Sequence, residues 1–431
     1  MVSDKRDKQS GYLWVEEGEP KALPIITVAP VAPVDKVYTF TASKELTEQL
    51  RVGQRVLVPF GRRNRPAPAF VISIDTGPWS STLKPVDSIL DPAGELSPHL
   101  LELGRWMARH YCCPLGRTLA AMVPAAVRRQ SGYVTVRLAS LARPLDDIQP
   151  TRLGAKQRAI LDRLGAADGP LDVGRLLEET QSKRATLRSL ISKGWVTETV
   201  SKQAPKLPDD HSPGAEPDFA LNSAQQGALS RVEAAVEAEA FRALVLFGVS
   251  GSGKTEVYVR AIRRLLARGR QAIMLVPEIA LTTQLVQRLA ARFERVAVVH
   301  SGLTDVQRSL TWEAIRSGDR PVVIGTRSAV FAPCPDLGLF VVDEEQETSY
   351  KNLQSPRFGV RDVALKRAHL LKIPIILGSA TPSLETWHNL HRLPSYERID
   401  LPQRVRALPM PTVRLVDMGN ERIVADRVCC M

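Results

Sequence analysis

Residues 248–255 read Gly-Val-Ser-Gly-Ser-Gly-Lys-Thr, and these types in this order can hold the phosphates of a nucleotide. Glycines let backbone N–H groups wrap around phosphate oxygens at the start of a helix. Lys254 would then reach the β- and γ-phosphates, and the Thr255 hydroxyl would ligate Mg²⁺. The apolar strand ALVLF precedes the segment and a helical pattern follows it, as this chemistry requires. The predicted ATP-binding residues are Gly248, Val249, Ser250, Gly251, Ser252, Gly253, Lys254 and Thr255.

Two adjacent carboxylates, Asp343 and Glu344, follow the apolar run LFVV. Parallel α/β sheets place ligands at the carboxyl ends of their strands. Asp343 is therefore predicted to hold Mg²⁺, and Glu344 to orient or deprotonate the attacking water. A strand that ends in acidic residues is common by itself, so this prediction depends on the phosphate loop upstream. Lys254, Asp343 and Glu344 are the predicted catalytic residues.

A third motif, GSATP, follows the apolar run IPIIL. Its short hydroxyl side chains, Ser379 and Thr381, could sense the state of the acidic cluster, although the motif taken alone is an ordinary turn. Upstream of the phosphate loop, Gln225 could hydrogen-bond adenine and is included among the predicted ATP-binding residues. A plain helix-capping role for Asn222 explains that segment at least as well.

These motifs need a parallel sheet that brings the ends of its strands together. Between residues 220 and 400, near-continuous apolar runs alternate with helical stretches, which is typical of a parallel α/β sheet covered by helices. The runs are ALVLFG, QAIMLVPE, VAVVH, PVVIGT, LFVVDEE and PIILGSAT. Residues 220–400 are therefore predicted to form one ATP-binding P-loop lobe.

The chain upstream of that lobe has a different organisation. Residues 1–22 read as a flexible leader. Residues 23–130 are predicted to form a β-rich domain, because short apolar runs such as VYTFTA and QRVLVPFG are separated by Pro and Gly. Helical spacing in SPHLLELGRWMARHY and a second apolar helix follow those runs. Residues 204–219, rich in Pro, Asp, Ser and Gly, read as a linker.

Residues 150–203 read as short helices and a final strand that begins GWV, a pattern that resembles a winged helix. Residues 182–193 are predicted to be its recognition-type helix. The basic side chains of this helix, Arg184 and Arg188 among them, could face DNA. A solvated basic face on a small helical domain is the alternative.

The composition favours a polyanionic partner and argues against a membrane-spanning or secreted protein. The chain has 431 residues, 44% of them hydrophobic, which is enough for two or three packed domains. Its formal net charge of +12 favours nucleic acid, although a merely basic protein would explain the charge alone. No apolar stretch reaches the ~18 residues of a membrane helix, and the N-terminus lacks a signal-peptide core. The five cysteines form no CxxC pair and no zinc spacing, which predicts a reducing, cytoplasmic location.

The order of these motifs is that of the first lobe of a superfamily 2 helicase. The segments are GVSGSGKTEVY, VPEIALT, HSGL, IGTRSAVFAP, DEEQETSYK and GSATPSLET. They resemble those of the primosomal protein N′ family, the PriA-type replication-restart DNA helicases of bacteria. Upstream, VYTF, GQRVLVPFGRR and HYCCPLG resemble that family's β-rich 3′-end-binding domain. The resemblance covers nearly the whole chain, from about residue 25 to about residue 418.

The resemblance implies an α/β fold, in which a small β-rich DNA-binding domain and a winged helix precede a RecA-like P-loop lobe. The implied activity is ATP-dependent 3′-to-5′ DNA unwinding at stalled forks, with ATP and Mg²⁺ as cofactors. The implied partners are forked and single-stranded DNA with a free 3′ end, other primosome proteins and single-strand binding protein, without a membrane. The loop from Tyr350 to Arg361 would contact DNA, or else be an ordinary solvated connection. The expected DNA-binding residues are Thr326, Arg327, Lys351, Phe358, Arg361, Arg184 and Arg188.

The sequence departs from the family pattern at two points. Gln346 stands where the family usually has His. Glutamine can still hydrogen-bond, so Gln346, Ser379 and Thr381 are predicted to couple the ATP site to DNA. The family continues with a cysteine-rich zinc module and a second lobe, so we expect residues 401–431 to be a truncated segment and the zinc ligands to be absent. A fragment, a shifted frame and a degenerate copy are the alternatives for its origin.

The expected truncation has a mechanistic consequence. An arginine finger from a second lobe is worth ~10³ to 10⁵ in rate. We therefore expect this chain to bind DNA and ATP but to hydrolyse ATP and unwind DNA poorly.

Two other functions stay open at this stage. The first is a non-enzymatic module that binds a DNA fork or 3′ end and carries a vestigial ATPase lobe. The second is another superfamily 2 enzyme that takes its second lobe from a partner chain, against which the VYTF and VPFGRR segments argue. A small-molecule kinase also uses a P-loop but would lack the TRS and SAT series.

Overall fold

The computed structural model describes residues 23–77, 82–90, 96–124, 127, 134–143, 153–167, 169–203, 219–278, 288–289, 291–405, 422–424 and 427–429. Several predicted segments lie outside the described residues. They are the leader 1–22, the linker apart from Phe219, the PEIALT motif from Ile279 onward, and most of the segment 401–431.

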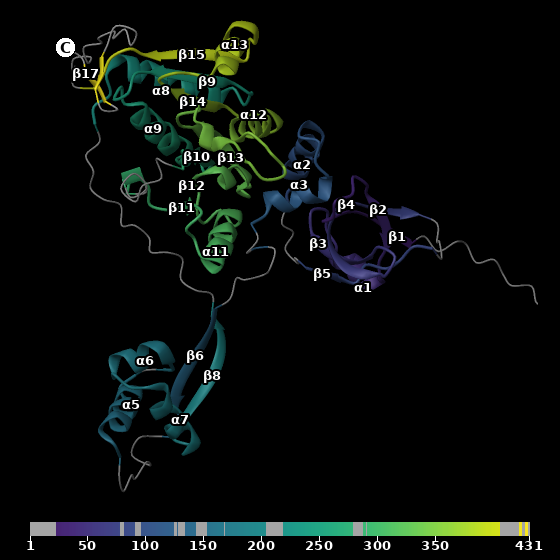
Figure 1. Ribbon diagram of the computed structural model, residues 1–431, viewed down its shortest axis with the longest axis vertical. Helices are drawn as coiled ribbons and strands as arrows, with labels where there is room; N and C mark the ends of the chain where they lie inside the picture. The colour runs from purple at the N-terminus through teal and green to yellow at the C-terminus, as the bar shows by residue number, and fades with distance from the viewer. Residues whose placement is uncertain are drawn as a thin grey trace, which may run out of the picture.

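The N-terminal strands form an antiparallel sheet in the order β2–β1–β4–β3–β5. Thr41 and Val86 link its two edges, since the Val86 N–H donates to the Thr41 carbonyl at 2.8 Å, and Figure 1 shows the sheet as a ring. Every second side chain of a strand faces the same side, so Ile26, Val56 and Val71 meet in one buried core. The elements are β1 (Leu23–Pro30), β2 (Tyr38–Thr41), α1 (Lys44–Gln49), β3 (Arg55–Phe60), β4 (Arg65–Gly77) and β5 (Ser88–Ile89).

Two helices, α2 (Pro98–His110) and α3 (Leu115–Met122), follow the ring and pack against it. A Cβ atom on Gly116 would lie 1.9 Å from the Pro30 carbonyl oxygen, so α3 touches β1 backbone to backbone at a position that only glycine permits. The buried face of α2 belongs to the same apolar core as Phe331 and Val363 of the predicted P-loop lobe. Figure 1 shows α2 and α3 lying between the ring and that lobe.

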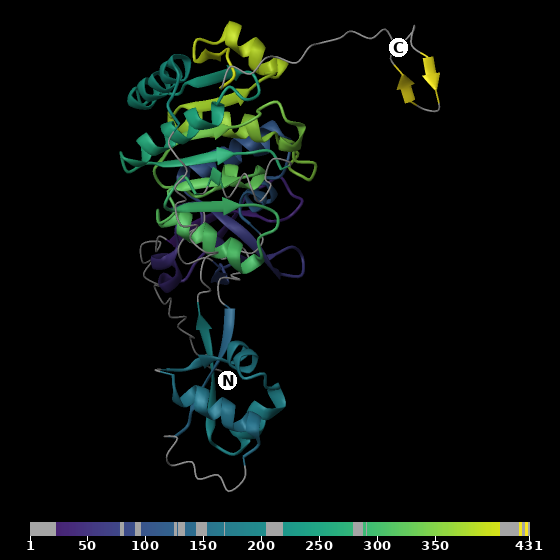
Figure 2. The ribbon, with the colours of Figure 1, turned by 90° about the vertical axis from the view of Figure 1, so that its left-hand side faces the viewer.

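Three helices and a three-stranded antiparallel sheet form a unit with a separate core, visible at the bottom of Figure 2. The helix that contains Leu187 and Leu190 buries those two side chains and leaves Arg188 exposed. The final strand pairs with a strand upstream of residue 150, so the sheet takes in residues that the sequence interpretation left out. The elements are β6 (Val134–Leu141), α5 (Ala155–Gly165), β7 (Leu171–Asp172), α6 (Val173–Glu179), α7 (Arg184–Ser192) and β8 (Val196–Gln203), in the sheet order β7–β6–β8.

The predicted P-loop lobe, residues 220–400, contains a seven-stranded parallel sheet in the order β11–β12–β10–β13–β14–β9–β15. Alternate residues of β9 enter two different cores, Ala243 and Val245 on one face and Leu244 and Leu246 on the other. Because both faces are buried, the strands are apolar almost throughout. Figure 2 shows the stacked strands with helices beside them. The strands are β9 (Ala243–Gly248), β10 (Gln271–Leu275), β11 (Val296–Val299), β12 (Val322–Gly325), β13 (Leu337–Val342), β14 (Ile375–Ser379) and β15 (Tyr396–Leu401).

The expected α/β fold class is thereby confirmed. The sequence did not single out β15, because its charged side chains break the apolar pattern of a buried strand. The helices of the lobe are α8 (Ser223–Glu237), α9 (Lys254–Leu266), α11 (Asp305–Arg316), η2 (Arg327–Phe331), η3 (Thr348–Tyr350), α12 (Val360–Leu371) and α13 (Leu384–Arg392). A short hairpin, β16 (Arg422–Val424) and β17 (Arg427–Cys429), follows. No helix among the described residues is long and apolar enough to cross a membrane.

A histidine and an arginine meet where α2 packs on the lobe. The Nε2 atom of His99 lies 3.3 Å from Nη2 of the buried Arg367 on α12. Burial, and secondly the Arg367 charge, lower the pKa of His99 from 6.5 to about 4. The folded protein therefore keeps this imidazole neutral beside a guanidinium.

We expect this contact to make the stability of the protein pH-dependent. Because the folded pKa of His99 lies below its ordinary value, the native state binds fewer protons. The contribution is present above about pH 6.5 and is lost as the pH falls through about 4. A shift of that size corresponds to about 3 kcal/mol at most. Urea unfolding should show that the wild type loses stability relative to His99→Gln over this window. The exposed His110→Gln on the same helix is the control, and identical slopes in wild type and His99→Gln would contradict the prediction.

Candidate active site

Three motifs meet because the strands that carry them are neighbours. The phosphate loop follows β9, the acidic motif follows β13 and the SAT motif follows β14. These strands stand side by side and parallel in the order β13–β14–β9, so their carboxyl ends share one edge of the sheet. That edge is where open α/β sheets bind ligands.

The phosphate loop has a backbone that requires glycine. Gly251 and Gly253 have φ angles of +80° and +83°, in the left-handed region that side chains disfavour. A Cβ atom on Gly253 would also lie 2.3 Å from Nε2 of Gln225. Within the described part of the chain, the backbone N–H groups of Ser250, Gly251 and Gly253 have no acceptor, and the buried Ser252 hydroxyl has no partner. An anion with several oxygens fits this set of donors.

Gln225 holds the loop to α8. Its Nε2 donates to the Ser252 carbonyl at 2.9 Å, and its Oε1 accepts from the Asn222 backbone N–H at 2.9 Å. The Asn222 side chain in turn accepts from the Gln225 backbone N–H, so a capping role for Asn222 is confirmed. Both polar atoms of the Gln225 side chain are thus engaged inside the protein, and an adenine contact stays a prediction.

Lys254 lies at the start of α9 with its ammonium group held over the loop. The Nζ atom donates to the Gly248 carbonyl at 2.9 Å and lies 3.6 Å from Oε1 of Glu344. Only 8% of the side chain is exposed, so the charge is concentrated at the loop. Glu344 has a φ angle of +46°, an unusual backbone conformation for a glutamate, and such conformations cluster at functional sites.

Asp343 is buried below this pair. The Tyr258 hydroxyl donates to its Oδ1 at 3.1 Å. Burial, and secondly the Glu344 charge, raise the pKa of Asp343 from 3.8 to about 6, while the Tyr258 hydrogen bond and the Lys254 charge oppose the shift. A carboxylate whose charge is this poorly compensated is suited to a cation.

The contact between Asp343 and Tyr258 depends on the absence of a side chain at Gly378. A Cβ atom there would lie 1.6 Å from the Tyr258 hydroxyl oxygen. We expect Gly378→Ala to displace Tyr258, to cost about 1–3 kcal/mol of stability and to weaken nucleotide binding. Denaturant unfolding and titration with a fluorescent ATP analogue would measure both effects. Gly227→Ala, on α8 with open space around it, is the control and should be stabilising. Unchanged stability and affinity in Gly378→Ala would contradict the prediction.

A series of hydrogen bonds joins the acidic motif to the SAT motif. Gln346 Nε2 donates to Oε2 of Glu344 at 2.9 Å, and the Ser379 hydroxyl donates to Oε1 of Gln346 at 2.6 Å. The Thr381 backbone N–H donates to the Ser379 hydroxyl at 2.9 Å. Gln346 therefore bridges two motifs that are more than thirty residues apart in the chain.

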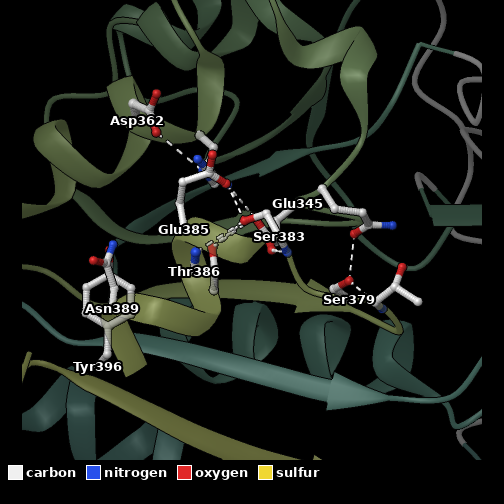
Figure 3. Close-up of polar contacts among 11 residues, drawn as sticks. Glu345, Asp362, Ser379, Ser383, Glu385, Thr386, Asn389 and Tyr396 are labelled. Atoms are coloured by element: carbon white, nitrogen blue, oxygen red, sulfur yellow. Dashed lines mark hydrogen bonds and ion pairs between the residues drawn. The ribbon is translucent and has the colours of Figure 1, made fainter. Parts of the chain in front are cut away.

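Glu345 forms a second buried network that the sequence interpretation missed. Its carboxylate accepts from the Ser383 backbone N–H at 2.7 Å and the Thr386 hydroxyl at 3.1 Å, and it pairs with Arg361 at 3.1 Å (Figure 3). The network ties the acidic motif to the starts of α12 and α13. The only local signal was the third acidic residue in a row after the strand.

Two predicted DNA-binding residues have other contacts. Phe358 is 5% exposed and packs edge-on against Phe331, so its ring is not available to a base in this conformation. Arg361 forms ion pairs with Glu345 and Asp362 and is 18% exposed, so its charge is largely compensated inside the protein. The positions of Phe358 and Arg361 in the sequence do not indicate that both side chains make their contacts inside the protein.

The other predicted DNA-binding residues lie closer to the surface, with one exception. Thr326 is buried at the end of β12. Arg327 donates to the Lys351 carbonyl at 3.3 Å and pairs with Glu278 at 3.1 Å, and Lys351 itself is exposed. In the smaller unit, Arg184 pairs with Glu198 at 2.6 Å, whereas Arg188 is exposed.

The protein groups at this edge also suit Mg²⁺ held together with a nucleotide. Thr255 is exposed on the first turn of α9, and Asp343 supplies a carboxylate. No group of three or more His, Cys, Asp or Glu side chains in the described ranges could hold a metal ion alone. Mg²⁺ commonly takes one or two protein oxygens and completes its shell with substrate phosphates and water.

Comparisons with known proteins define the class. The family model described as DEAD/DEAH box helicase matches residues 223–390, and the model described as the 3'DNA-binding domain (3'BD) of PriA matches residues 27–124. The lobe with the three motifs is thus a helicase lobe of this class, in the same chain as a 3'DNA-binding domain.

Curated relatives narrow the assignment. Replication restart protein PriA of Bacillus subtilis is 30% identical over 90% of this chain and 56% of its own length. The protein of the same name in Synechocystis is 31% identical over 97% of this chain and 59% of its own length. The chain belongs to the PriA family of replication restart proteins. It spans somewhat more than half the length of these two relatives. A solved structure of the helicase MrfA bound to DNA is 15% identical over 62% of this chain and 30% of that chain, with a TM-score of 0.31.

Proposed function

We propose that the protein is an ATP-dependent DNA helicase that unwinds in the 3′-to-5′ direction when replication restarts at stalled forks. The observation that carries this proposal is the polar series Lys254–Glu344–Gln346–Ser379, which crosses three neighbouring parallel strands. A 3'DNA-binding domain match in the same chain supports DNA as the substrate.

ATP would supply the phosphoanhydride bond whose hydrolysis drives movement along DNA. Lys254 would bind phosphate oxygens, and Thr255 and Asp343 would hold Mg²⁺. Glu344 would orient the attacking water or accept its proton. The Lys254 ammonium group lies 3.6 Å from Glu344, which places the proposed phosphate-binding and water-orienting side chains next to each other.

Gln346 is the proposed coupling residue. Its side-chain amide bonds two partners at once, because Nε2 donates to Glu344 and Oε1 accepts from Ser379. A change in the position or charge of Glu344 on hydrolysis would therefore alter the bond to Ser379, and through it the backbone at Thr381. This relay needs hydrogen bonding from residue 346 and not a titrating imidazole.

The proposed DNA path runs over the other half of the sheet edge. Arg327 would contact the single-strand backbone, with Lys351 beside it, and a DNA contact of the buried Thr326 stays a prediction. Arg188 would contact duplex phosphates from the smaller unit, with Arg184 close by. Contacts of this kind are independent of base sequence and weaken as salt is raised. Forked DNA with a free 3′ end is the proposed ligand, primosome proteins and single-strand binding protein are the proposed partners, and the cytoplasm is the proposed location.

The test combines binding and turnover. The purified chain is titrated with a labelled fork that carries a free 3′ hydroxyl, and ATP hydrolysis is followed with and without that fork. Fork binding that falls with salt, together with hydrolysis that rises with the fork, supports the proposal. Absence of fork binding would overturn it. Fork binding without any DNA-dependent hydrolysis would favour the non-enzymatic binding module instead.

A further inference from the structure

The loop of residues 351–359, which follows the acidic motif, has a narrow neck and an exposed tip. Lys351 and Gly359 face each other across an antiparallel bridge, and the Asn352 backbone N–H donates to the Phe358 carbonyl at 2.9 Å. At the tip, the Leu353 side chain is 77% exposed. A large apolar side chain at an exposed tip is suited to packing between bases.

The base of this loop is tied to the ATP site. The Tyr350 hydroxyl donates to the Asp343 carbonyl at 2.8 Å. The Lys351 carbonyl accepts from Arg327 of the TRS motif at 3.3 Å. Movement at the neck therefore reaches both Asp343 and a proposed DNA-binding residue.

Tyr111, at the end of α2, holds the neck from the N-terminal side. The Gly359 backbone N–H donates to the Tyr111 hydroxyl at 3.2 Å, and the Lys351 ammonium lies 5.7 Å from the centre of the Tyr111 ring. One tyrosine thus contacts both sides of the neck. Next to it, Sγ of Cys113 lies 3.3 Å from the hydroxyl of Ser355 on the loop.

The α2–α3 segment that carries Tyr111 is fastened to the N-terminal ring. Arg105 on α2 donates to the Ile72 carbonyl of β4 at 3.4 Å, and α3 approaches Pro30 at Gly116 so closely that no side chain fits. Phe70 of the ring shares the buried core of α2. A displacement of the ring would therefore displace Tyr111 with it.

We infer that Tyr111 is a positioning residue that links the N-terminal domain to the loop 351–359, so that a DNA 3′ end engaged by that domain orders the loop and, through Tyr350, the Asp343 backbone. This inference rests on the proposed function, because it requires the N-terminal domain to bind a DNA 3′ end. It assigns to the domain an effect on the ATP site in addition to DNA binding.

Hydrogen exchange at the loop tests this link without requiring ATP turnover. Peptides that cover residues 351–359 are followed with the full chain alone, with a fork bearing a 3′ hydroxyl, and with the same fork bearing a 3′ phosphate. In the wild type, the 3′ hydroxyl fork should slow loop exchange by about five- to tenfold, the effect of one hydrogen bond of ordinary strength. Tyr111→Phe keeps the ring and removes only the acceptor for Gly359, so fork affinity should stay within about twofold and the protection should be lost.

Two further variants complete the design. Ser355→Ala removes the Cys113 contact from the loop side and should weaken the protection in the same direction. Tyr396→Phe removes a half-buried hydroxyl that accepts a hydrogen bond from Nδ2 of Asn389 on α13 at 3.4 Å, and it should leave the protection intact. A fluorescent ATP analogue gives a second readout, since the fork should raise its affinity by about fivefold or more in wild type but not in Tyr111→Phe.

The outcomes separate the two levels of the proposal. Equal loop protection in wild type and Tyr111→Phe would overturn the link, and so would fork binding that leaves the wild-type loop unprotected. Absence of fork binding in the wild type would instead overturn the proposed function itself.

Discussion

Lys254→Ala is expected to lower ATP turnover by about 10²- to 10³-fold, the usual effect of removing one donor that stabilises developing charge. Lys254 is the side chain at the phosphate loop that brings a positive charge within 4 Å of Glu344. Its removal takes away the proposed phosphate contact and the ion pair with Glu344. Affinity for Mg²⁺-ATP should fall as well, whereas fork affinity should not change.

A matched control for this variant is Lys366→Ala, a half-buried lysine on α12 away from the phosphate loop. Turnover with a fork present, and binding of a fluorescent ATP analogue, are measured for both variants and the wild type. DNA-dependent turnover that survives in Lys254→Ala would show that the phosphate loop does not carry the activity.

Arg367→Ala should destabilise the protein by about 3 kcal/mol, the largest stability effect that we expect from one substitution. The side chain is 0% exposed, and it donates to the Val330 and Ala332 carbonyls at 2.7 and 2.8 Å. Truncation leaves a cavity and two buried carbonyls without a donor. Burial lowers the pKa of the guanidinium to about 10, so relief of that burial cost offsets part of the loss.

The consequences of Arg367→Ala should extend beyond stability. Val330 lies in η2 and Ala332 directly follows it, in the segment that continues the TRS motif, so fork affinity should fall together with stability. Arg367→Lys keeps a charge but has a single nitrogen, and should recover part of the loss. Arg392→Ala, an exposed arginine on α13, is the control for denaturant unfolding. Stability within about 0.5 kcal/mol of the wild type would refute the structural role.

The sequence predicted the fold class and the family because both rest on local patterns. Six apolar runs with helical stretches between them predicted the parallel sheet, and all six are strands of it. Whether Lys254, Asp343 and Glu344 perform the proposed chemistry stays a prediction. Their convergence at one sheet edge is what that chemistry requires.

Residues whose roles depend on packing were harder to predict. Phe358 and Arg361 have the types expected of DNA contacts, yet the first packs on Phe331 and the second pairs with Glu345. Arg367 lies on α12 and is fully buried, and the apolar periodicity of that helix does not predict a buried arginine. Side-chain direction at such positions is decided by neighbours that are distant in the chain.

By itself the sequence predicted six of the seven strands of the parallel sheet, the glycine-rich loop proposed to bind phosphate and the family the chain belongs to, because strand patterns and glycine-dependent loops are encoded by consecutive residues. The tertiary structure alone decided the strand order, which puts the three ATP-site motifs on the neighbouring strands β13, β14 and β9 and the TRS motif beyond β10 on β12. It also decided that Tyr111, directly after α2, meets the loop at Gly359. These relations depend on which buried surfaces pack together. The local sequence pattern does not specify that packing.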